Sequence, residues 1–270
     1  MFTIFGSTGF IGSRLVNRLQ RDGVACYCPS RADGIPGGNL GNVIYCIGLT
    51  ADFRTKPFET VEAHVCHLAN ILRSCEFDSF MYLSSTRVYG FRGTVATEND
   101  VLQVEPLVAD DLYNISKIMG ESICFSSGRN VRVVRLSNVY GYDRKSENFV
   151  FTIIRDALSN NRIVLNTALG SSKDHINVDD VASILPKIAL NGKYNLYNIA
   201  NGSNVTVGNI TGKIQELTGC DIVLNKDVRT IRAPRIDINR VRGEFDFKPT
   251  GILDDLEPII EDYRKREGVK

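Results

Sequence analysis

The sequence predicts a doubly wound α/β fold, in which helices cover both faces of a parallel sheet. In the first half of the 270-residue chain, apolar strand-like runs alternate with helical patterns. The strand-like runs are continuously apolar, which is typical of strands buried on both faces. The helical patterns between them supply the long connections that parallel strands need.

The expected elements follow one another in a regular order. Strands are expected at "FTIFG", "VACYC", "NVIYCIG", "SFMYLSS" and "VRVVRLSNVYG", and helices over about residues 12–21, 57–75 and 111–125. Only "RADGIPGGNLG" separates the second strand from the next one, which is too short for a further strand and helix. We therefore expect the third strand of the sheet to be short or missing.

A glycine-rich turn follows the first strand. The motif "GSTGFIG" places Gly6, Gly9 and Gly12 between that strand and the first helix. Phosphate binding at such a turn uses backbone N–H groups, glycines that let the main chain approach the ligand, and the positive end of the helix dipole. The motif predicts a Rossmann-like dinucleotide site with contacts from Gly6, Thr8, Gly9, Phe10, Ile11 and Gly12.

The end of the second strand bears on the choice of dinucleotide. The stretch "CPSRADG" offers Ser30 and Arg31 at this place, with Asp33 slightly beyond. A hydroxyl and a guanidinium suit the 2′-phosphate of NADP, whereas a carboxylate here would suit the ribose of NAD. We expect NADP, and Asp33 keeps NAD open as the alternative.

The second half of the chain has Asn- and Gly-rich connections and shorter helical patterns such as "VGNITGKIQEL". We expect residues 1–140 and 175–200 to form the dinucleotide-binding domain. Residues 141–174 and 201–270 are expected to form a smaller C-terminal substrate-binding lobe.

Composition excludes several classes of function. The net charge of +1 gives no overall attraction to nucleic acid or to an anionic membrane. No apolar run approaches the roughly 20 residues that span a bilayer, and the N-terminal stretch does not resemble a signal peptide, so we expect a cytoplasmic protein. The seven cysteines are expected to be reduced core residues, and no metal site is expected because His64 and His67 lack grouped partner ligands.

The motif "LYNISK" places Tyr113 and Lys117 one helical turn apart. This spacing is weakly specific alone, but it follows the glycine turn and "YLSSTRVYG", where a strand ends in hydroxyl residues. Together with "YCIGLTAD", "VRLSNVYG", "DHINVDDVA" and "YNLYNIANG", the motifs span nearly the whole chain. In this order they resemble the extended short-chain dehydrogenase/reductase family, which modifies nucleotide-activated sugars.

The resemblance implies a catalytic set of Ser85, Tyr113 and Lys117. A free phenol has a pKa of about 10, and Lys117 with a positive nicotinamide ring is expected to lower the pKa of Tyr113. Tyr113 would then exchange a proton with a sugar oxygen, which Ser85 also hydrogen-bonds, while hydride moves at the attached carbon. The resemblance further implies a homodimer, and cofactor contacts from Ile47, Gly48, Tyr113 and Lys117.

The resemblance also indicates which residues bind the substrate. It implies that Thr86 contacts the substrate and that Asn138 and Lys173 face the diphosphate of a nucleotide sugar. The segment "VRTIRAPRIDINRVRG" contains five arginines, of which Arg229 and Arg232 are the expected phosphate ligands. A solvated charged face is the alternative interpretation of this segment.

Departures from the family narrow the reaction. Thr86 and Arg87 stand where the resembling 4,6-dehydratases carry an Asp-Glu pair, so removal of water is not expected. His64 stands where relatives often have asparagine, and Thr50 replaces a lysine of some epimerases.

The leading hypothesis is an NADPH-dependent reductase of a keto group, at C4 of a nucleotide-linked deoxysugar. The alternative is a 4-epimerase that oxidises and re-reduces the same carbon with retained NAD⁺. The Ser30–Arg31 pair and Thr50 favour the reductase, because a reductase must exchange its cofactor in every turnover. A non-catalytic NADP-sensing regulator is a third hypothesis, and the presence of both Tyr113 and Lys117 speaks against it.

Overall fold

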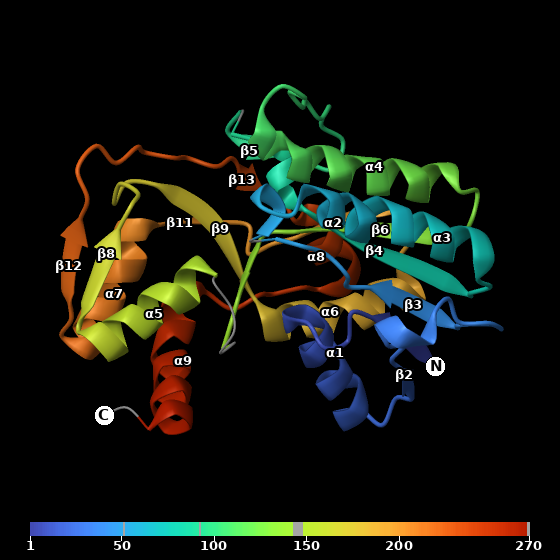
Figure 1. Ribbon diagram of the computed structural model, residues 1–270. Coiled ribbons are helices and arrows are strands. Elements are labelled where there is room, and N and C mark those ends of the chain that lie inside the picture. Colours follow the sequence, from blue (N-terminus) through green and yellow to red (C-terminus); the bar gives the residue numbers. More distant parts are fainter. Residues whose placement is uncertain (51, 92, 143–147, 269–270) are drawn as a thin grey trace.

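The computed structural model describes residues 1–50, 52–91, 93–142 and 148–268, except the side chain of Arg31. Its centre is a six-stranded sheet with the order β10-β6-β4-β3-β1-β2 (Figure 1). All neighbouring strands of this sheet are parallel. The strands are β1 (Phe2–Phe5), β2 (Cys26–Tyr27), β3 (Asn42–Tyr45), β4 (Ser79–Ser85), β6 (Val131–Leu136) and β10 (Leu196–Ile199).

The sheet lacks the third strand of the expected topology. From β2 the chain passes through the short helix η1 (Arg31–Asp33) and pairs β3 with the other side of β1. Within the described residues no strand lies beyond β2, which is itself only two residues long. The prediction of a short or missing third strand is therefore confirmed.

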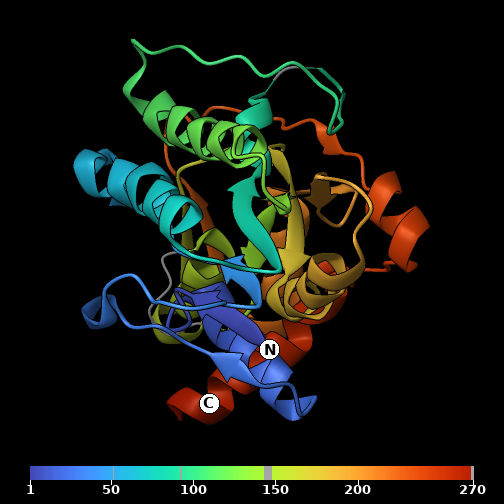
Figure 2. The same ribbon diagram turned by 90° about the vertical axis from the view of Figure 1, so that its right-hand side faces the viewer.

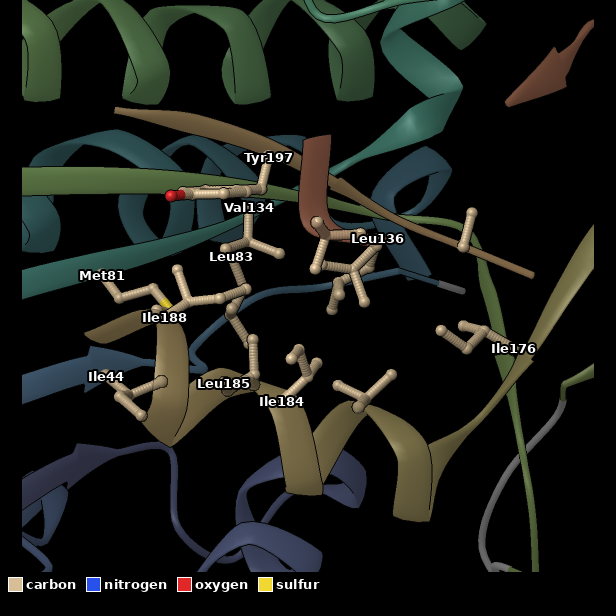
Figure 3. Packing of buried hydrophobic residues seen from close by; sticks show 14 of the residues in the cluster. Ile44, Met81, Leu83, Val134, Leu136, Ile176, Ile184, Leu185, Ile188 and Tyr197 are labelled. Carbon is tan, nitrogen blue, oxygen red and sulfur yellow. The ribbon is translucent and has the colours of Figure 1, made fainter. Parts of the chain in front are cut away.

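Helices cover both faces of the sheet, as predicted. In Figures 1 and 2, α1 (Phe10–Arg21) and α6 (Val178–Asn191) lie on one face, and α3 (His67–Ser74) and α4 (Leu112–Ser126) lie on the other. Strand β3 serves both faces, because Ile44 packs toward α6 while Val43 and Tyr45 pack in the opposite cluster. Figure 3 shows the first cluster, in which Ile184, Leu185 and Ile188 of α6 meet the sheet.

The helical segment predicted over residues 57–75 has an interruption. It consists of α2 (Pro57–Val61), the π-helix η3 (Glu62–Cys66) and α3. Two tyrosines of the sheet bind its main chain: the Tyr45 hydroxyl donates to the Ala63 carbonyl at 2.6 Å and the Tyr82 hydroxyl to the His64 carbonyl at 3.3 Å. Such π segments are frequent at functional sites.

A second group of elements has its own buried cluster. It contains α5 (Phe149–Asn160), β8 (Arg162–Leu165), α7 (Val207–Thr218), β12 (Asp221–Leu224) and α9 (Ile252–Glu267). Figure 1 shows these elements to one side of the six-stranded sheet. The small sheet β11-β9-β7 comprises β11 (Asn204–Thr206), β9 (Ser172–Asn177) and β7 (Asn138–Tyr140).

The stretch expected as one strand at "VRVVRLSNVYG" is divided between two sheets. Strand β6 pairs with β4 and β10, whereas β7 pairs with β9. The single-strand prediction was wrong because an apolar run carries no signal for the point at which the chain changes partner. The remaining elements are η2 (Asp52–Arg54), η4 (Thr86–Tyr89), β5 (Val95–Ala96), η5 (Ala109–Asp111), β13 (Arg235–Ile236) and α8 (Asn239–Phe245).

The seven cysteines are free thiols, but they are not all core residues. Cys28 and Cys66 are exposed, so the prediction of a core position was wrong for these two. Strand β2 ends at Tyr27, which leaves Cys28 outside the sheet. No group of three or more metal-ligating side chains occurs among the described residues. Among the described residues, no helix has the length and the apolar character needed to cross a membrane.

Candidate active site

The glycine turn has a shape that side chains would destroy. Gly6 has a φ of +77°, and a Cβ there would lie 3.0 Å from the backbone of Cys46 and Ile47. A Cβ on Gly12 would lie 2.2 Å from the Gly6 carbonyl oxygen. Helix α1 begins at Phe10 without a side-chain cap, so its first N–H groups are available to an anion. The turn that carries the predicted contacts therefore forms one cradle whose shape suits a dinucleotide phosphate. The predicted contacts are Gly6, Thr8, Gly9, Phe10, Ile11 and Gly12.

Ser30 and Asp33 lie together at the end of the second strand. The Ser30 hydroxyl accepts a hydrogen bond from the Ala32 N–H at 3.3 Å, and the Ser30 N–H donates to the Asp33 carboxylate at 2.7 Å. The backbone N–H and the side chain of Ser30 lower the pKa of Asp33, because both stabilise its charged form by hydrogen bonding. Asp33 thus serves as a cap of its own turn, while the Arg31 side chain lies outside the described part of the chain.

Tyr113 lies at the start of α4 with a buried side chain. Its ring packs against Phe53, with ring centres 5.4 Å apart, and meets the edge of His64 at the same separation. Its hydroxyl faces the hydroxyls of Ser85, at the end of β4, and of Thr50, which both lower its pKa as hydrogen-bonding groups. Two predicted catalytic residues, Ser85 and Tyr113, are thus brought into contact.

Lys117 is buried one turn further along α4. Its Nζ donates to the Leu83 carbonyl at 2.8 Å and lies 4.9 Å from the centre of the Tyr82 ring. Burial lowers the pKa of Lys117 to about 7. A Cβ on Gly48 would come within 3.4 Å of this Nζ, so the loop after β3, with predicted cofactor residues 47 and 48, borders the catalytic helix.

The surroundings of Tyr113 in the protein raise the pKa of its hydroxyl. Burial raises it, while the hydrogen bond from Ser85, the charge of Arg87 and the hydrogen bond from Thr50 lower it in part. Lys117 is not among these influences, because its ammonium is turned to the Leu83 carbonyl. The expectation that Lys117 and a bound nicotinamide together lower the pKa of Tyr113 stays a prediction.

His64 is fully buried. The Leu49 N–H donates to its Nε2 at 3.2 Å, and its Nδ1 lies 2.8 Å from the Ser116 hydroxyl. Because the Ser116 hydroxyl donates to the Tyr113 carbonyl, His64 donates from Nδ1 and is neutral. Burial and Lys117 lower the pKa of His64 to about 2. His64 thus ties the loop after β3 to the catalytic helix.

A buried ion pair supports the catalytic helix from the sheet. Arg135 of β6 donates to both carboxylate oxygens of Glu121, at 2.6 and 3.0 Å, and the Ser84 hydroxyl donates to the same carboxylate at 2.5 Å. Arg135 also donates to the Tyr89 hydroxyl at 2.9 Å. This network fixes α4, and with it Tyr113 and Lys117, relative to the end of β4.

The residues expected to bind the substrate lie on neighbouring elements. Thr86 is half-buried at the start of η4, directly after Ser85. Asn138 of β7 is exposed and donates to the Asp174 carbonyl at 2.7 Å, next to Lys173 on β9. Lys173 is half-buried, and its pKa is lowered by burial and by the charge of Arg87.

The five arginines of residues 228–243 do not form one cluster. Arg229 and Arg232 are exposed, and the Arg232 backbone bridges to Ser172, beside Lys173. Arg240 instead donates to the Leu196 carbonyl at 2.7 Å and lies 3.9 Å from the Glu98 carboxylate, at the edge strand β10. The structure thus brings only part of this segment near the other predicted residues.

The side chains of Thr50 and Arg87 both act on Tyr113, and sequence reasoning missed this role of the two residues. Both had been noted only as departures from family patterns, since no spacing in the sequence connects them with residue 113. Thr50 follows β3, and Arg87 lies in η4, which follows β4. The carboxyl ends of these adjacent parallel strands lie at the same edge of the sheet. Residues that follow such strand ends are expected to lie close together, and this expectation could have grouped Thr50 and Arg87 with Tyr113.

Comparisons with known proteins agree with this arrangement. A dTDP-4-dehydro-6-deoxy-D-allose reductase of a Streptomyces species is 23% identical, with 97% of this chain and 95% of the relative aligned. The dTDP-4-dehydro-6-deoxyglucose reductase of Escherichia coli is 27% identical over 76% of this chain and 67% of the relative. The solved structure of MoeE5 in complex with UDP-glucose and NAD has a TM-score of 0.84 at 22% identity, covering 98% of this chain and 99% of that chain.

A family model also matches most of the chain. The model of the NAD dependent epimerase/dehydratase family matches residues 2–200 of the 270. This match includes the glycine cradle, the ends of β3 and β4, and helix α4, which carries Tyr113 and Lys117. The resemblance drawn from the sequence motifs is thereby confirmed, and the chain belongs to the NAD dependent epimerase/dehydratase family.

Proposed function

We propose that the protein is an NADPH-dependent reductase of a 4-keto group on a nucleotide-linked deoxysugar. The observation that carries this proposal is the buried Tyr113 hydroxyl, which is hydrogen-bonded by Ser85 one helical turn from Lys117. Two reductases of dTDP-4-dehydro-6-deoxy sugars among the relatives support the same reaction class. The Asp-Glu pair of the resembling dehydratases is absent, since Thr86 and Arg87 stand in its place.

The dinucleotide fits the cradle because Gly6 and Gly12 leave space that any Cβ would fill. When bound, NADPH supplies the hydride. Residues 6–12 would hold its phosphates, and Ser30 with Arg31 its 2′-phosphate. NADPH is preferred over NADH in this proposal, and equal or tighter binding of NADH in titration calorimetry would refute the preference.

The chain's own residues would manage the proton. Tyr113 donates its hydroxyl proton to the substrate carbonyl oxygen as that carbon is reduced, and Ser85 hydrogen-bonds the same oxygen. Both side chains are buried or half-buried, which strengthens these hydrogen bonds. Lys117 would hold the nicotinamide ribose, and the proton lost by Tyr113 is regained from solvent.

The smaller lobe, residues 141–174 and 201–270, is proposed to hold the nucleotide end of the substrate. Lys173, Asn138 and Arg232 lie where β9 and β7 meet the arginine-containing segment, so they would face the diphosphate. We expect Arg232→Ala to raise KM for the nucleotide sugar. Unchanged kinetics would assign the phosphate contacts to other residues. The homodimer and the cytoplasmic location remain predictions from the sequence.

The test follows NADPH oxidation with a dTDP-4-keto-6-deoxyhexose. Tyr113→Phe is expected to reduce kcat by about 10²- to 10⁴-fold while NADPH still binds. The matched control is Tyr263→Phe, because Tyr263 is a similarly buried tyrosine of α9 in the smaller lobe. Full activity of Tyr113→Phe would refute the mechanism. Interconversion of 4-epimers with bound NAD⁺ and no net oxidation would instead identify a 4-epimerase.

A further inference from the structure

Arg87 lies against the reacting phenol. It belongs to η4, the turn that follows Ser85, and its guanidinium carbon lies 5.2 Å from the centre of the Tyr113 ring. The same carbon lies 4.8 Å from the centre of the Phe53 ring. A cation at this distance from an aromatic ring interacts with its π electrons, and the attraction increases when the ring becomes negatively charged.

Arg87 is held in place without an acidic partner. One guanidinium nitrogen of Arg87 donates to the backbone carbonyl of Asp110 at 3.2 Å, and the backbone N–H of Arg87 donates to the Ser85 hydroxyl at 3.2 Å. The Asp110 carboxylate is taken by Arg54, in two bonds of 2.6 and 2.8 Å. Within the described residues no carboxylate forms an ion pair with Arg87, so its charge is not neutralised by a direct contact.

The other groups around Tyr113 do not supply a comparable charge. His64 is neutral, and Phe53, Ser85 and Thr50 carry no charge. Lys117 points to the Leu83 carbonyl.

Beyond this first layer, the charged groups lie around Arg87. Lys173 is close enough to Arg87 to have its pKa lowered by it, and Asp110 and Asp111 act on Arg87 from η5. Arg54 acts on Arg87 from η2. Among the cation–ring contacts of the described part of the chain, the contact with the Tyr113 ring comes from Arg87.

We infer that Arg87 is a positioning residue that acts through Tyr113, stabilising the phenolate left behind when Tyr113 gives its proton to the substrate. This inference rests on the proposed function. In the step, the O–H bond of Tyr113 breaks and an O–H bond forms on the substrate oxygen, while the hydride comes from NADPH. The negative charge then resides on the phenol ring beside Arg87. The role commonly given to the lysine of the motif is thereby shared with an arginine from the neighbouring strand end.

The test compares Arg87→Gln with Arg54→Gln. Arg54 is a matched control, because it stacks on the same Phe53 ring at 4.5 Å but is not in contact with the Tyr113 ring. The rate of NADPH oxidation is followed against pH, since activity falls at high pH when Tyr113 ionises. Arg87→Gln is expected to move this high-pH limb upward by about one pH unit, and Arg54→Gln and Arg87→Lys to leave it near that of the wild type.

A second measurement needs no substrate. Tyrosinate absorbance is titrated in the NADP⁺ complex, and the contribution of Tyr113 is obtained by difference from Tyr113→Phe. The Tyr113 transition is expected at higher pH in Arg87→Gln than in the wild type. A Tyr113 transition at the same pH in Arg87→Gln and in the wild type overturns the inference. A raised KM of Arg87→Gln with an unchanged high-pH limb of the pH–rate profile also overturns it, and would make Arg87 a substrate ligand. Because this titration works without turnover, it separates failure of the inference from failure of the proposed reaction.

Discussion

The cradle makes a sharp prediction for Gly12→Ala. The added Cβ would lie 2.2 Å from the Gly6 carbonyl oxygen, 2.9 Å from its carbon and 3.0 Å from the Ser7 Cα, whereas ordinary contact begins at 3.4 Å. All three atoms are backbone, so no side chain can rotate away. Helix α1 must then move from the turn by roughly 1 Å, at a cost of about 1–3 kcal/mol. This corresponds to dinucleotide binding about 5- to 150-fold weaker, because the cradle is shaped by this contact.

The assay is a fluorescence titration of NADPH against the purified variant, with urea unfolding in parallel. Gly212→Ala is the matched control, because Gly212 lies inside α7 and a Cβ there meets nothing within 4 Å. It is expected to leave NADPH binding unchanged and to raise the free energy of unfolding by about 0.5–1 kcal/mol. NADPH affinity of Gly12→Ala within twofold of the wild type would show that the turn does not form the binding site.

Two further predictions concern buried charge. Glu121→Gln leaves the buried Arg135 without its carboxylate and should lower the free energy of unfolding by about 3–5 kcal/mol. Asp262→Asn, in an exposed ion pair of α9, should lower it by less than about 1 kcal/mol, and equal losses for the two variants in urea unfolding would contradict this prediction. The pKa of His64 is about 2 in the folded chain and 6.5 in the unfolded chain. As the pH falls below 6.5, His64 is therefore protonated in the unfolded chain and stays neutral in the folded chain, which favours unfolding. Between pH 7.5 and 5 the free energy of unfolding, measured in urea, should therefore fall by about 2 kcal/mol more in the wild type than in His64→Asn. Equal falls in the two proteins would argue against a neutral buried histidine.

The order of strands and helices could be predicted because each buried strand is an apolar run and each connection is long enough for a helix. The absent third strand was visible for the same reason, since eleven residues cannot hold a strand and a helix. Where two strands join different sheets, as β6 and β7 do, the run looks continuous and the division is lost. The interruption at η3 was equally hidden, because it is bound by hydroxyls of Tyr45 and Tyr82 from separate strands.

The proposed catalytic residues could be named from the sequence because their chemistry depends on residue type and on spacing within one helix. Tyr113 and Lys117 share a turn, and Ser85 ends the strand that precedes η4. The electrostatics of the site could not be derived in this way. Whether Lys117 or Arg87 is the cation felt by Tyr113 depends on where each flexible side chain finds a hydrogen-bond acceptor, and only the folded structure shows this.

The π-helix η3 also constrains how the chain can change length. Residues 62–66 advance with wider turns than the α-helical segments on either side, so one residue is accommodated there that a regular α-helix would not hold. Deleting a single residue in this stretch would convert it to an ordinary α-helix and leave the two flanks in register, while the side chains inside the stretch would change direction. His64 would then no longer point at Leu49 and Ser116. The stretch from Glu62 to Cys66 is therefore a place where the helix can lose one residue while its two flanks keep their packing, at the expense of the His64 contacts.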